Sequence, residues 1–340
     1  MSEKQFDVFS IGRVSMDLFA QQIGAEFEDV EGFDTSVGGS PVNIAIGASR
    51  LGLRSGVLTA VGEDLVGDFV LRYLAREGVH TEFIRRKSNA RTGLAIVAVQ
   101  PPDRFPLVFY RENPADIHLT VQDAQDLPFD RIRAFMISGT ALSRGSCRDA
   151  VLYVAERCRA NGVTTFMDLD LRPDQWQEPW DFGLNIRTIL PNVDVIIGTE
   201  EEFFALLDPD PVNIMEGKSV DRAQRDALPA LMTDLLSSGH PGRALVLKRG
   251  ERGVSVYRSK DYLVHKAGFK VEIVNTVGAG DAFASGLIYG YLQGWDWGRC
   301  CELANACGAL TVSRHGCSAV FPNLQEAIDF IDGHGDSSGD

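Results

Sequence analysis

The second half of the chain alternates regularly between short apolar runs and amphipathic stretches. The apolar runs are Ala134–Ser138, Thr164–Asp168, Val193–Gly198 and Ala244–Lys248. The amphipathic stretches between them include residues 147–161, 201–207 and about 223–238. Strands that are apolar along their whole length are buried on both faces, and helices between them make the strands parallel. The pattern therefore predicts an α/β fold with a central, mostly parallel sheet and helices on both faces.

The first half begins with the same alternation. Its strand patterns are residues 6–12 and 55–61, and its helical patterns are residues 42–51 and 67–77. Ser40 is suited to cap the first of these helices and Pro41 to begin it, because the pyrrolidine ring pre-sets a helical φ. The sheet is therefore expected to include strands from both halves of the chain.

Between residues 92 and 111 the alternation stops. Two strand patterns, 92–100 and 107–111, follow each other across a proline-rich connection without a helix. Such a hairpin predicts a small β lid outside the main sheet. We expect one domain over residues 1–332, with the lid formed from about 13–37 and 92–115. Other expectations are a surface excursion at 208–226, a late hairpin at 254–257 and 263–266, two further helices at about 299–313 and 324–331, and a disordered tail at 333–340.

Composition excludes several partners. A net charge of -14 and a pI of about 4.9 argue against nucleic acid and against an anionic membrane surface. The six cysteines form no CxxC pair and no zinc-like spacing with histidine, which favours buried, reduced thiols. The N-terminus has no signal-peptide pattern, and no apolar run reaches membrane-spanning length. These features predict a cytoplasmic enzyme that acts on small molecules.

One short stretch, residues 275–283, carries most of the chemical information. The sequence Asn-Thr-Val-Gly-Ala-Gly-Asp-Ala-Phe combines a small-residue turn with the start of an amphipathic helix. A helix N-terminus presents unpaired N–H groups and a positive dipole end, so an anion is its natural ligand. Asp281 in the first helical turn has two interpretations. It either complements the helix dipole or orients and deprotonates a hydroxyl that attacks a phosphoryl group.

Further polar residues follow the ends of predicted strands. Asp17, Asp168, Glu202 and Lys248 lie at or just after such ends, as does the 278–281 turn. Because ligands of open α/β sheets bind beyond the carboxyl ends of the strands, we expect these groups to share one crevice. The chain has no G-x-x-x-x-G-K-[ST] motif, and no G-x-G-x-x-G follows its first strand. Both a P-loop enzyme and a dinucleotide-dependent dehydrogenase are thereby disfavoured.

Two motifs resemble the PfkB family of ribokinase-like carbohydrate kinases, and the similarity extends over about residues 6–325. The first is Gly-Gly-Ser-Pro-Val-Asn-Ile-Ala at 38–45, and the more specific second one is Thr-Val-Gly-Ala-Gly-Asp-Ala-Phe at 276–283. Supporting matches are Lys-Arg-Gly-Glu-Arg-Gly at 248–253 and Ala-Asn-Ala at 304–306. The resemblance implies a ribokinase-like fold and transfer of a phosphoryl group from ATP to a sugar hydroxyl.

The resemblance also implies roles for individual residues. Asp281 would be the base for the sugar hydroxyl, and the backbone of Gly278, Ala279 and Gly280 would complete the anion hole with it. The residues implied to bind the sugar are Asp17, Gly38, Gly39, Asn43, Arg111, Asp168 and Arg172, and those implied to bind ATP are Lys248, Gly250, Gly253, Thr276 and Asn305. From physical principles alone, a helix N-terminus is expected to lower the pKa of Asp281.

The metal sites of the family are altered in this sequence. Members have Asn-x-x-Glu where this chain has Thr199 to Glu202, and the resemblance implies that Glu202 organises Mg²⁺ through water. Many members have Asp where this chain has Asn275, in a zone that with Arg314 and Gly316 holds a monovalent cation in relatives. The loss of that carboxylate leaves a requirement for K⁺ open.

Arg111 and Arg172 bear on the choice of sugar. A planar guanidinium at the mouth of the crevice suits a carboxylate, although Arg172 has the alternative of pairing with Asp168 or Asp170. Both segments resemble those of the sugar-acid kinases in the family, which implies 5-dehydro-2-deoxy-D-gluconate of myo-inositol catabolism as acceptor. The alternatives are 2-keto-3-deoxygluconate, or fructose or ribose. A different class, a non-catalytic sugar-binding regulator, would not need to keep Asp281. Pairing of two lids in a homodimer is also expected by resemblance.

Overall fold

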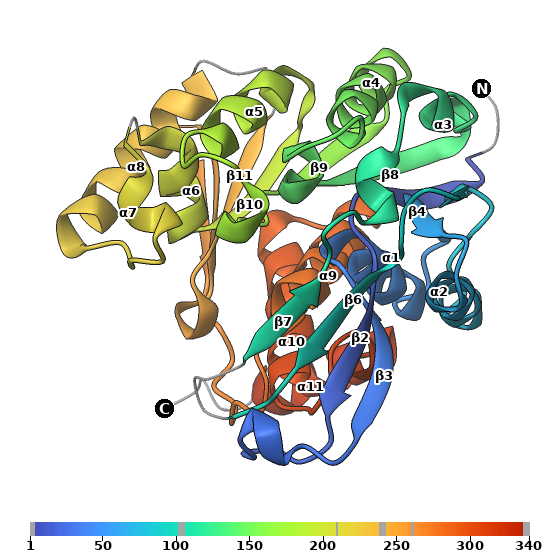
Figure 1. The fold of residues 1–340 in the computed structure, drawn as a ribbon. Coiled ribbons are helices and arrows are strands. Elements are labelled where there is room, and N and C mark those ends of the chain that lie inside the picture. Colours follow the sequence, from blue (N-terminus) through green and yellow to red (C-terminus); the bar gives the residue numbers. More distant parts are fainter. Residues whose placement is uncertain (1–3, 101–105, 209, 238–242, 260–261, 336–340) are drawn as a thin grey trace.

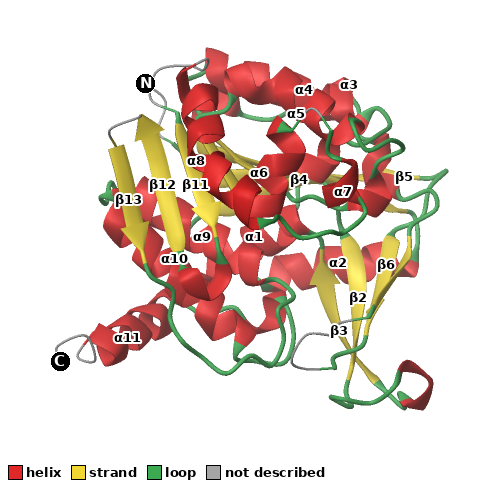
Figure 2. Cartoon of the chain, turned by 90° about the vertical axis from the view of Figure 1, so that its left-hand side faces the viewer, coloured by secondary structure: helices red, strands yellow, loops and turns green. Residues whose placement is uncertain are grey.

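The computed structural model describes residues 4–100, 106–208, 210–237, 243–259 and 262–335. Nine strands of the described residues form the main sheet, in the order β13-β12-β11-β10-β9-β8-β1-β4-β5 (Figures 1 and 2). They are β1 (Phe6–Ile11), β4 (Ser55–Gly62), β5 (Ile84–Lys87), β8 (Ile132–Ser138), β9 (Thr164–Asp168), β10 (Val195–Thr199), β11 (Ala244–Lys248), β12 (Val254–Ser259) and β13 (Tyr262–Lys266). All pair in parallel except the hairpin β12–β13, which adds to β11 in antiparallel orientation. The α/β prediction and the late hairpin are confirmed.

Helices cover both faces of this sheet. On one face α4 (Cys147–Ala160), α5 (Asp181–Ile189), α6 (Glu200–Leu207) and α8 (Arg222–Ser237) bury one apolar cluster. On the other face α1 (Ser40–Arg50), α9 (Ala279–Leu292) and α10 (Trp297–Val312) bury a second cluster. Alternate residues of β8 divide between the two: Phe135 and Ile137 belong to the first cluster, Ala134 and Met136 to the second. This division explains why the central strands are apolar throughout.

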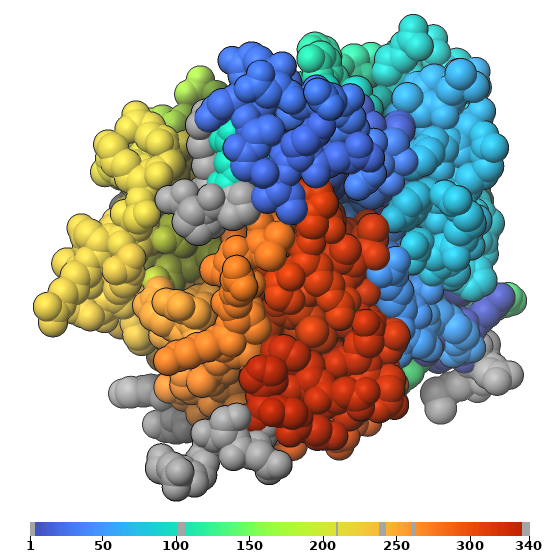
Figure 3. Space-filling model, turned by 90° about the horizontal axis from the view of Figure 1, so that it is seen from below, coloured from blue at the N-terminus to red at the C-terminus, as the bar shows by residue number. Residues whose placement is uncertain are grey.

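The predicted lid is a separate four-stranded sheet in the order β3-β2-β6-β7. It consists of β2 (Ser15–Ala20), β3 (Phe33–Gly38), β6 (Gly93–Val97) and β7 (Leu107–Tyr110). Its N-terminal strands lie beside the C-terminal helices, so segments from opposite ends of the chain form one surface (Figure 3). Residues 101–105 of the proline-rich connection, with Pro101 and Pro102 among them, lie outside the described residues. The lid is the feature that places side chains above the carboxyl ends of the main strands.

Three predictions about the N-terminal region were wrong. Asp17 lies in the middle of lid strand β2, opposite Ser36 of β3, and not in a turn at a strand end. Helix α1 begins at Ser40 with Gly39 as its N-cap, so Ser40 is the first helical residue and does not cap it. The reason is that Gly39 adopts φ +103, which lets the helix begin one residue earlier than a serine cap allows. Helix α2 (Leu65–Arg76) begins two residues before its predicted start, capped by Asp64.

Other differences concern helices and strands that the sequence pattern did not predict, because they are short or polar. Strand β5 has the sequence Ile-Arg-Arg-Lys and lies at the edge of the sheet, where no apolar pattern is required. The sequence also gave no sign of α3 (Val121–Gln125) or α5. The excursion at 208–226 contains α7 (Val212–Met215), and its Ile214 and Val220 are buried in the core. Helix α11 (Leu324–Gly335) continues into the predicted tail, and residues 336–340 lie outside the described residues.

The six cysteines are all buried and free, as expected. Burial raises the pKa of Cys147, Cys158 and Cys317 well above the ordinary thiol value, which keeps them protonated and unreactive. In the described part of the chain, no helix is both long and apolar enough to cross a membrane.

Candidate active site

The lid joins the main body at two glycines that allow very close packing. A Cβ on Gly38 would lie 1.8 Å from Oδ2 of Asp17, and a Cβ on Gly39 would lie 2.5 Å from the backbone oxygen of Arg13. Asp17 is buried, and Oδ1 accepts a hydrogen bond of 2.6 Å from Oγ of Ser15. The diglycine therefore brings the lid carboxylate and the start of α1 together in one place.

Asn43 and Asp281 connect the first and last thirds of the chain. Nδ2 of Asn43, on α1, donates a hydrogen bond of 2.8 Å to Oδ2 of Asp281, on α9. Oγ of Ser285, one turn along α9, donates to the backbone oxygen of Ile44, so the two helices hold this pair in register. The close approach of α1 and α9 therefore fixes the direction of the Asp281 carboxylate.

Two buried polar atoms near these carboxylates have no hydrogen-bond partner in the part of the chain that the structure describes. They are Oδ1 of Asn43 and Oγ of Ser36. Ser36 lies directly opposite Asp17 in the lid. Buried polar atoms are normally paired, because leaving one unpaired costs about 1–3 kcal/mol. Such atoms beside two carboxylates are suited to a ligand with many hydroxyl groups.

Both carboxylates hold their protons more tightly than an ordinary aspartate. Burial raises the pKa of Asp281 to about 6, against the opposing hydrogen bond from Asn43. Burial likewise raises the pKa of Asp17 to about 6, against the hydrogen bond from Ser15. The expectation that the helix N-terminus lowers the pKa of Asp281 was wrong, because desolvation outweighs the dipole at this depth. A pKa near neutrality is favourable for a general base.

The turn before α9 has the geometry of an anion site. Gly278 caps the helix in a left-handed conformation (φ +84), and a Cβ there would lie 2.6 Å from Sγ of Cys317. The first N–H groups of α9 have no helical partner by geometry. A Cβ on Gly280 would lie 3.5 Å from Nζ of Lys248, so an ammonium group stands beside the turn. Helix N-terminus and cation together favour an anionic ligand.

Lys248 is held by a buried carboxylate. Nζ of Lys248 lies 2.9 Å from Oδ2 and 3.2 Å from Oδ1 of Asp168. Burial opposes the charge on Lys248, but Asp168, Glu202 and Asp281 raise its pKa above the ordinary value. Burial raises the pKa of Asp168, and Lys248 opposes that shift. Asp168 thus points at Lys248, and its predicted contact with the sugar stays a prediction.

Glu202 fastens the loop after β9 to the start of α6. Its Oε2 accepts from the backbone N–H of Thr199 at 2.7 Å and its Oε1 from that of Leu171 at 3.0 Å. Oγ1 of Thr199 caps the helix by accepting from N of Glu202, which completes a capping box. Glu200 pairs with Arg225 and Arg252, so its role is structural. Each oxygen of Glu202 retains acceptor capacity for a metal-bound water.

A cavity of about 500 Å³ lies beside the turn. All five residues predicted to bind ATP line it: Lys248, Gly250, Gly253, Thr276 and Asn305. Ala279, Gly280 and Thr199 also line it, so the cavity reaches the anion site. Nδ2 of Asn305 donates to the backbone oxygens of Lys266 and Ala267, and thereby holds one wall of the cavity against α10.

The two arginines expected at the mouth of the crevice lie in different environments. Arg111 is buried and donates two hydrogen bonds to Asp116, from Nη2 to Oδ1 at 2.8 Å and from Nη1 to Oδ2 at 3.0 Å. Its expected position at the mouth was therefore wrong, because Asp116 draws the guanidinium under the lid. The Arg172 side chain is 48% exposed and pairs with Asp170 at 3.3 Å, which is the alternative the sequence left open.

Sequence reasoning missed a role for Asp170 and Arg13. Asp170 has φ +41, a conformation that costs a non-glycine residue about 1–3 kcal/mol and marks functional sites. Its carboxylate accepts hydrogen bonds from Ser138, Thr140 and Arg13. Burial raises its pKa, but Arg172, Arg13 and these hydrogen bonds together lower it below the ordinary value. The signal was available in the sequence Asp-Leu-Asp-Leu-Arg at 168–172, where polar residues recur directly after a buried strand.

The fold and the site set a helix N-terminus suited to an anion beside a buried carboxylate of raised pKa and further polar groups. A model of the pfkB family carbohydrate kinases matches residues 5–324, so the chain belongs to this family and is a phosphotransferase with an alcohol group as acceptor.

Two curated relatives and one solved structure are similar over nearly the whole chain. The 5-dehydro-2-deoxygluconokinase of Geobacillus thermodenitrificans is 34% identical, covering 97% of this chain and 94% of that protein. The 5-dehydro-2-deoxygluconokinase 1 of Bacillus cereus is also 34% identical, covering 97% and 96%. The structure of a putative Ribokinase II from E. coli in complex with ATP and Mg²⁺ is 27% identical, with a TM-score of 0.81 and coverage of 97% and 100%.

The raised pKa of Asp281 predicts a pH-dependent cost in stability. A carboxylate whose pKa rises from 3.8 to about 6 on folding stabilises the folded state fully below about pH 3.8. This contribution is lost as the pH rises through about 6. Asp281→Asn should therefore unfold at higher urea than the wild type above about pH 6, by at most about 3 kcal/mol, with the difference vanishing toward about pH 4. Asp329→Asn, on the exposed face of α11, is the matched control. A constant difference at all pH values would contradict the shift.

Proposed function

We propose that the enzyme transfers the γ-phosphoryl group of ATP to a hydroxyl of a sugar acid, with 5-dehydro-2-deoxy-D-gluconate as the favoured acceptor. The observation that carries the proposal is the placement of Asp281. It stands between the anion site of α9 and a set of unpaired buried polar atoms suited to sugar hydroxyls. A nucleotide would occupy the 500 Å³ cavity on one side of the turn and the sugar the crevice under the lid on the other.

In the proposed reaction the sugar oxygen forms a bond to the γ-phosphorus, and the bond from that phosphorus to the β,γ-bridging oxygen breaks. ADP leaves with the bonding electron pair, and the hydroxyl proton passes to the carboxylate of Asp281. Asn43 keeps that carboxylate aimed, and the N–H groups of the turn stabilise the charge on the transferring group. Because the transition state is loose, positioning contributes more than base strength.

Mg²⁺ is supported by the solved relative and by the donors present. Among the described residues no cluster of three or more carboxylates, histidines or cysteines could hold a metal alone. This fits Mg²⁺, which keeps several waters and binds through few carboxylates together with substrate phosphates. Glu202 would hold such a water, and the ion would neutralise charge on the phosphates. Lys248 supplies a second cation beside the same turn.

The sugar acid is favoured over other acceptors for two reasons. The relatives named above carry that activity in their names, and Arg172 presents a half-exposed guanidinium near Asp281. The competing acceptors are 2-keto-3-deoxygluconate, which is also an acid, and the neutral sugars fructose and ribose. A regulator without activity is disfavoured, because it would not need a buried base at this energetic cost.

The test is ADP release with Mg-ATP and a panel of these four sugars. We expect the highest kcat/KM with 5-dehydro-2-deoxy-D-gluconate and a much lower value with fructose and ribose. Asp281→Asn should lower kcat by on the order of 10²-fold or more. The wild-type kcat/KM should rise with pH to a plateau, with a midpoint near the pKa of about 6. A neutral sugar as the best acceptor would refute the substrate, and near-normal turnover by Asp281→Asn would refute the base.

The residues present do not fit a potassium site. Asn275 is fully buried, Nδ2 donates to the backbone oxygen of Gly316 at 2.7 Å, and Oδ1 accepts from N of Val277 at 3.0 Å. The backbone oxygen of Gly316 is thus already bound by the amide, and Asn275 itself carries no charge that would balance a cation. We propose that this amide replaces the cation and that catalysis does not require K⁺.

Exchange of K⁺ for tetramethylammonium should therefore leave kcat and KM of the wild type unchanged. Asn275→Asp places an unbalanced buried carboxylate at this position and should therefore lower the melting temperature. Adding K⁺ should restore the melting temperature more than adding tetramethylammonium does. Activation of the wild type by K⁺ would contradict the proposal whatever the variant does.

The lid also supports a homodimer. Its outer face carries six apolar side chains in register across three strands, Met16, Leu18, Leu94, Ile96, Val108 and Tyr110. Val108 is 41% and Tyr110 53% exposed. Apolar sheet faces of this kind are normally covered. We propose that a second lid covers this one.

Val108→Glu should convert the dimer to a monomer in sedimentation analysis while the melting profile stays cooperative. Leu184→Glu, at an exposed apolar position on α5, is the control that should leave the mass unchanged. A monomeric wild type at micromolar concentration would contradict the proposal.

A further inference from the structure

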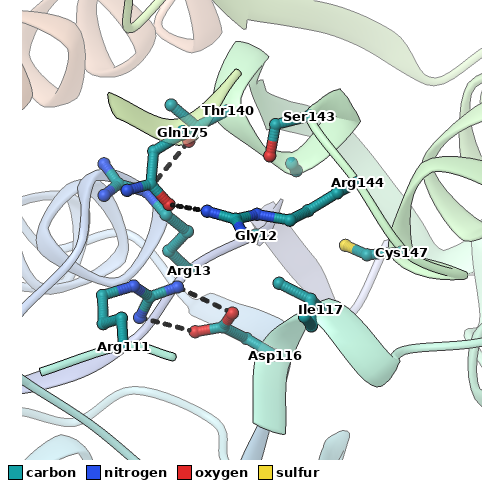
Figure 4. Close-up of a pocket in the computed structure, with 11 residues that line it drawn as sticks. Gly12, Arg13, Arg111, Asp116, Ile117, Thr140, Ser143, Arg144, Cys147 and Gln175 are labelled. Carbon is teal, nitrogen blue, oxygen red and sulfur yellow. Dashed lines mark hydrogen bonds and ion pairs between the residues drawn. The ribbon is translucent and has the colours of Figure 1, made fainter. Parts of the chain in front are cut away.

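The side-chain amide of Asn43 is held only through its nitrogen. Its oxygen, Oδ1, is buried and has no hydrogen-bond partner among the described residues. Arg111, under the lid, is by contrast fixed by two hydrogen bonds to Asp116 (Figure 4). The direction of the Asn43 amide, and with it the hydrogen bond to Asp281, therefore depends on the groups that its nitrogen contacts.

That nitrogen contacts two hydrogen-bond acceptors. Nδ2 of Asn43 donates to Oδ2 of Asp281 at 2.8 Å and to Sγ of Cys317 at 3.5 Å. An amide NH2 group has two hydrogens, and a cysteine sulfur is a weak acceptor for the second one. Because the last torsion of an asparagine side chain has a broad minimum, a single hydrogen bond would leave the amide plane loosely defined. Asp281 and Cys317 together define it.

The same sulfur lies against the anion turn. A Cβ on Gly278 would lie 2.6 Å from Sγ of Cys317, so the sulfur packs directly on the residue that caps α9. Cys317 is 1% exposed, and in a close-packed interior the loss of a buried atom lets its neighbours shift. Cys317 therefore contacts both the side chain that aims Asp281 and the turn in front of it.

The segment that carries Cys317 is anchored on both sides. The backbone oxygen of Gly316 accepts a hydrogen bond of 2.7 Å from Nδ2 of Asn275, in the stretch before the turn. Oγ of Ser318 donates to the backbone oxygen of Val37, on lid strand β3, at 3.0 Å. Asn275 and Ser318 are both fully buried. The position of the sulfur is thus set by the turn before α9 and by the lid, and not by the amide that it binds.

The sulfur is a neutral acceptor between two carboxylates. Burial raises the pKa of the Cys317 thiol well above the ordinary value, and the charges of Asp281 and Asp17 raise it further, so the thiol stays protonated. An ionised group here would place another negative charge beside Asp281 and beside a turn suited to an anion. The thiol accepts the hydrogen bond from Asn43 without adding that charge.

We propose that Cys317 is a positioning residue for phosphoryl transfer. Its sulfur fixes the amide of Asn43 and supports the turn at Gly278, so that the carboxylate of Asp281 and the anion site keep their relative placement. The inference rests on the proposed function, in which Asp281 is the base, and adds to it the group that holds this base through Asn43. The same contact leaves Oδ1 of Asn43 for a hydroxyl group of the sugar.

Cys317→Ala removes the sulfur and leaves the anchors of the segment in place. We expect kcat to fall roughly 2- to 12-fold, the range of one hydrogen bond. KM for ATP should stay the same, because Cys317 does not line the nucleotide cavity. The midpoint of the rise of kcat/KM with pH should move above that of the wild type, since the hydrogen bond from Asn43 lowers the pKa of Asp281 and is weakened in the variant. Cys317→Ser keeps a hydrogen-bond acceptor on a shorter side chain and should lie between the two.

Cys158→Ala is the matched control. Cys158, on α4, is also a fully buried thiol, and it belongs to the apolar cluster on the face of the main sheet away from α9. Its loss should lower the melting temperature, as the loss of any buried side chain does, but should change neither kcat nor the pH midpoint. Asp170 and Arg172, which also act on the pKa of Asp281, are unchanged in all of these variants.

The outcomes separate this inference from the proposed function. If Asp281→Asn turns over at a near-normal rate, the proposed base is refuted and the role of Cys317 with it. If Asp281→Asn is inactive while Cys317→Ala equals Cys158→Ala in kcat and pH midpoint, only the role of Cys317 is refuted. A lower kcat with an unchanged pH midpoint would show that Cys317 only supports the fold, and would also overturn the inference. If Cys317→Ala melts far below Cys158→Ala, the comparison is made with Cys317→Ser, for which the same criteria hold.

Discussion

The contact between α1 and α9 is the constraint on which the site depends. The hydrogen bond from Asn43 to Asp281 joins residues 238 positions apart, and it forms only because small residues let the two helices approach. A Cβ on Gly47 would lie 2.3 Å from Oγ of Ser285. This approach removes water from Asp281, and desolvation then raises its pKa toward the range useful for a base. The close approach of α1 and α9 therefore both positions Asp281 and raises its pKa.

The charges at the sheet edge are arranged in two groups with different tasks. Lys248 and Asp168 lie toward the nucleotide cavity, where a cation is needed beside phosphates. Arg13 and Arg111 act on Asp17, which in the proposed function belongs to the acceptor side. The buried Arg13 and Arg111 each have a buried aspartate as partner, Asp170 and Asp116, as expected when an unpaired buried charge costs several kcal/mol.

Sequence reasoning succeeded where a signal is local and failed where tertiary contacts decide. The buried strands and the turn at 278–281 were predictable because periodicity and glycine spacing depend only on residues that are close in the sequence. The strand position of Asp17 was not, because the chain passes from β1 to the lid strand β2 across only residues 12–14 and nothing local marks that change. The pKa of Asp281 was predicted with the wrong sign, since the helix dipole is visible in a sequence and the depth of burial is not. The buried position of the Arg111 side chain likewise depends on Asp116, and only the fold shows that the two side chains meet.

In the proposed function, the residues for phosphoryl transfer and the residues that bind the acceptor come from different parts of the fold. This separation affects how an enzyme of this kind can change its acceptor. The phosphoryl-transfer half is built from one continuous turn and two helices, and its parts constrain each other within a few ångströms. In the proposed function, the acceptor half is assembled from lid strands and from the segments after β1, β8 and β9, each of which is connected to a strand of the main sheet. A substitution in one of those segments alters charge and shape at the far end of the sugar without moving Asp281. Packing therefore fixes the geometry of phosphoryl transfer, and in the proposed function the identity of the sugar depends on side chains outside that packing.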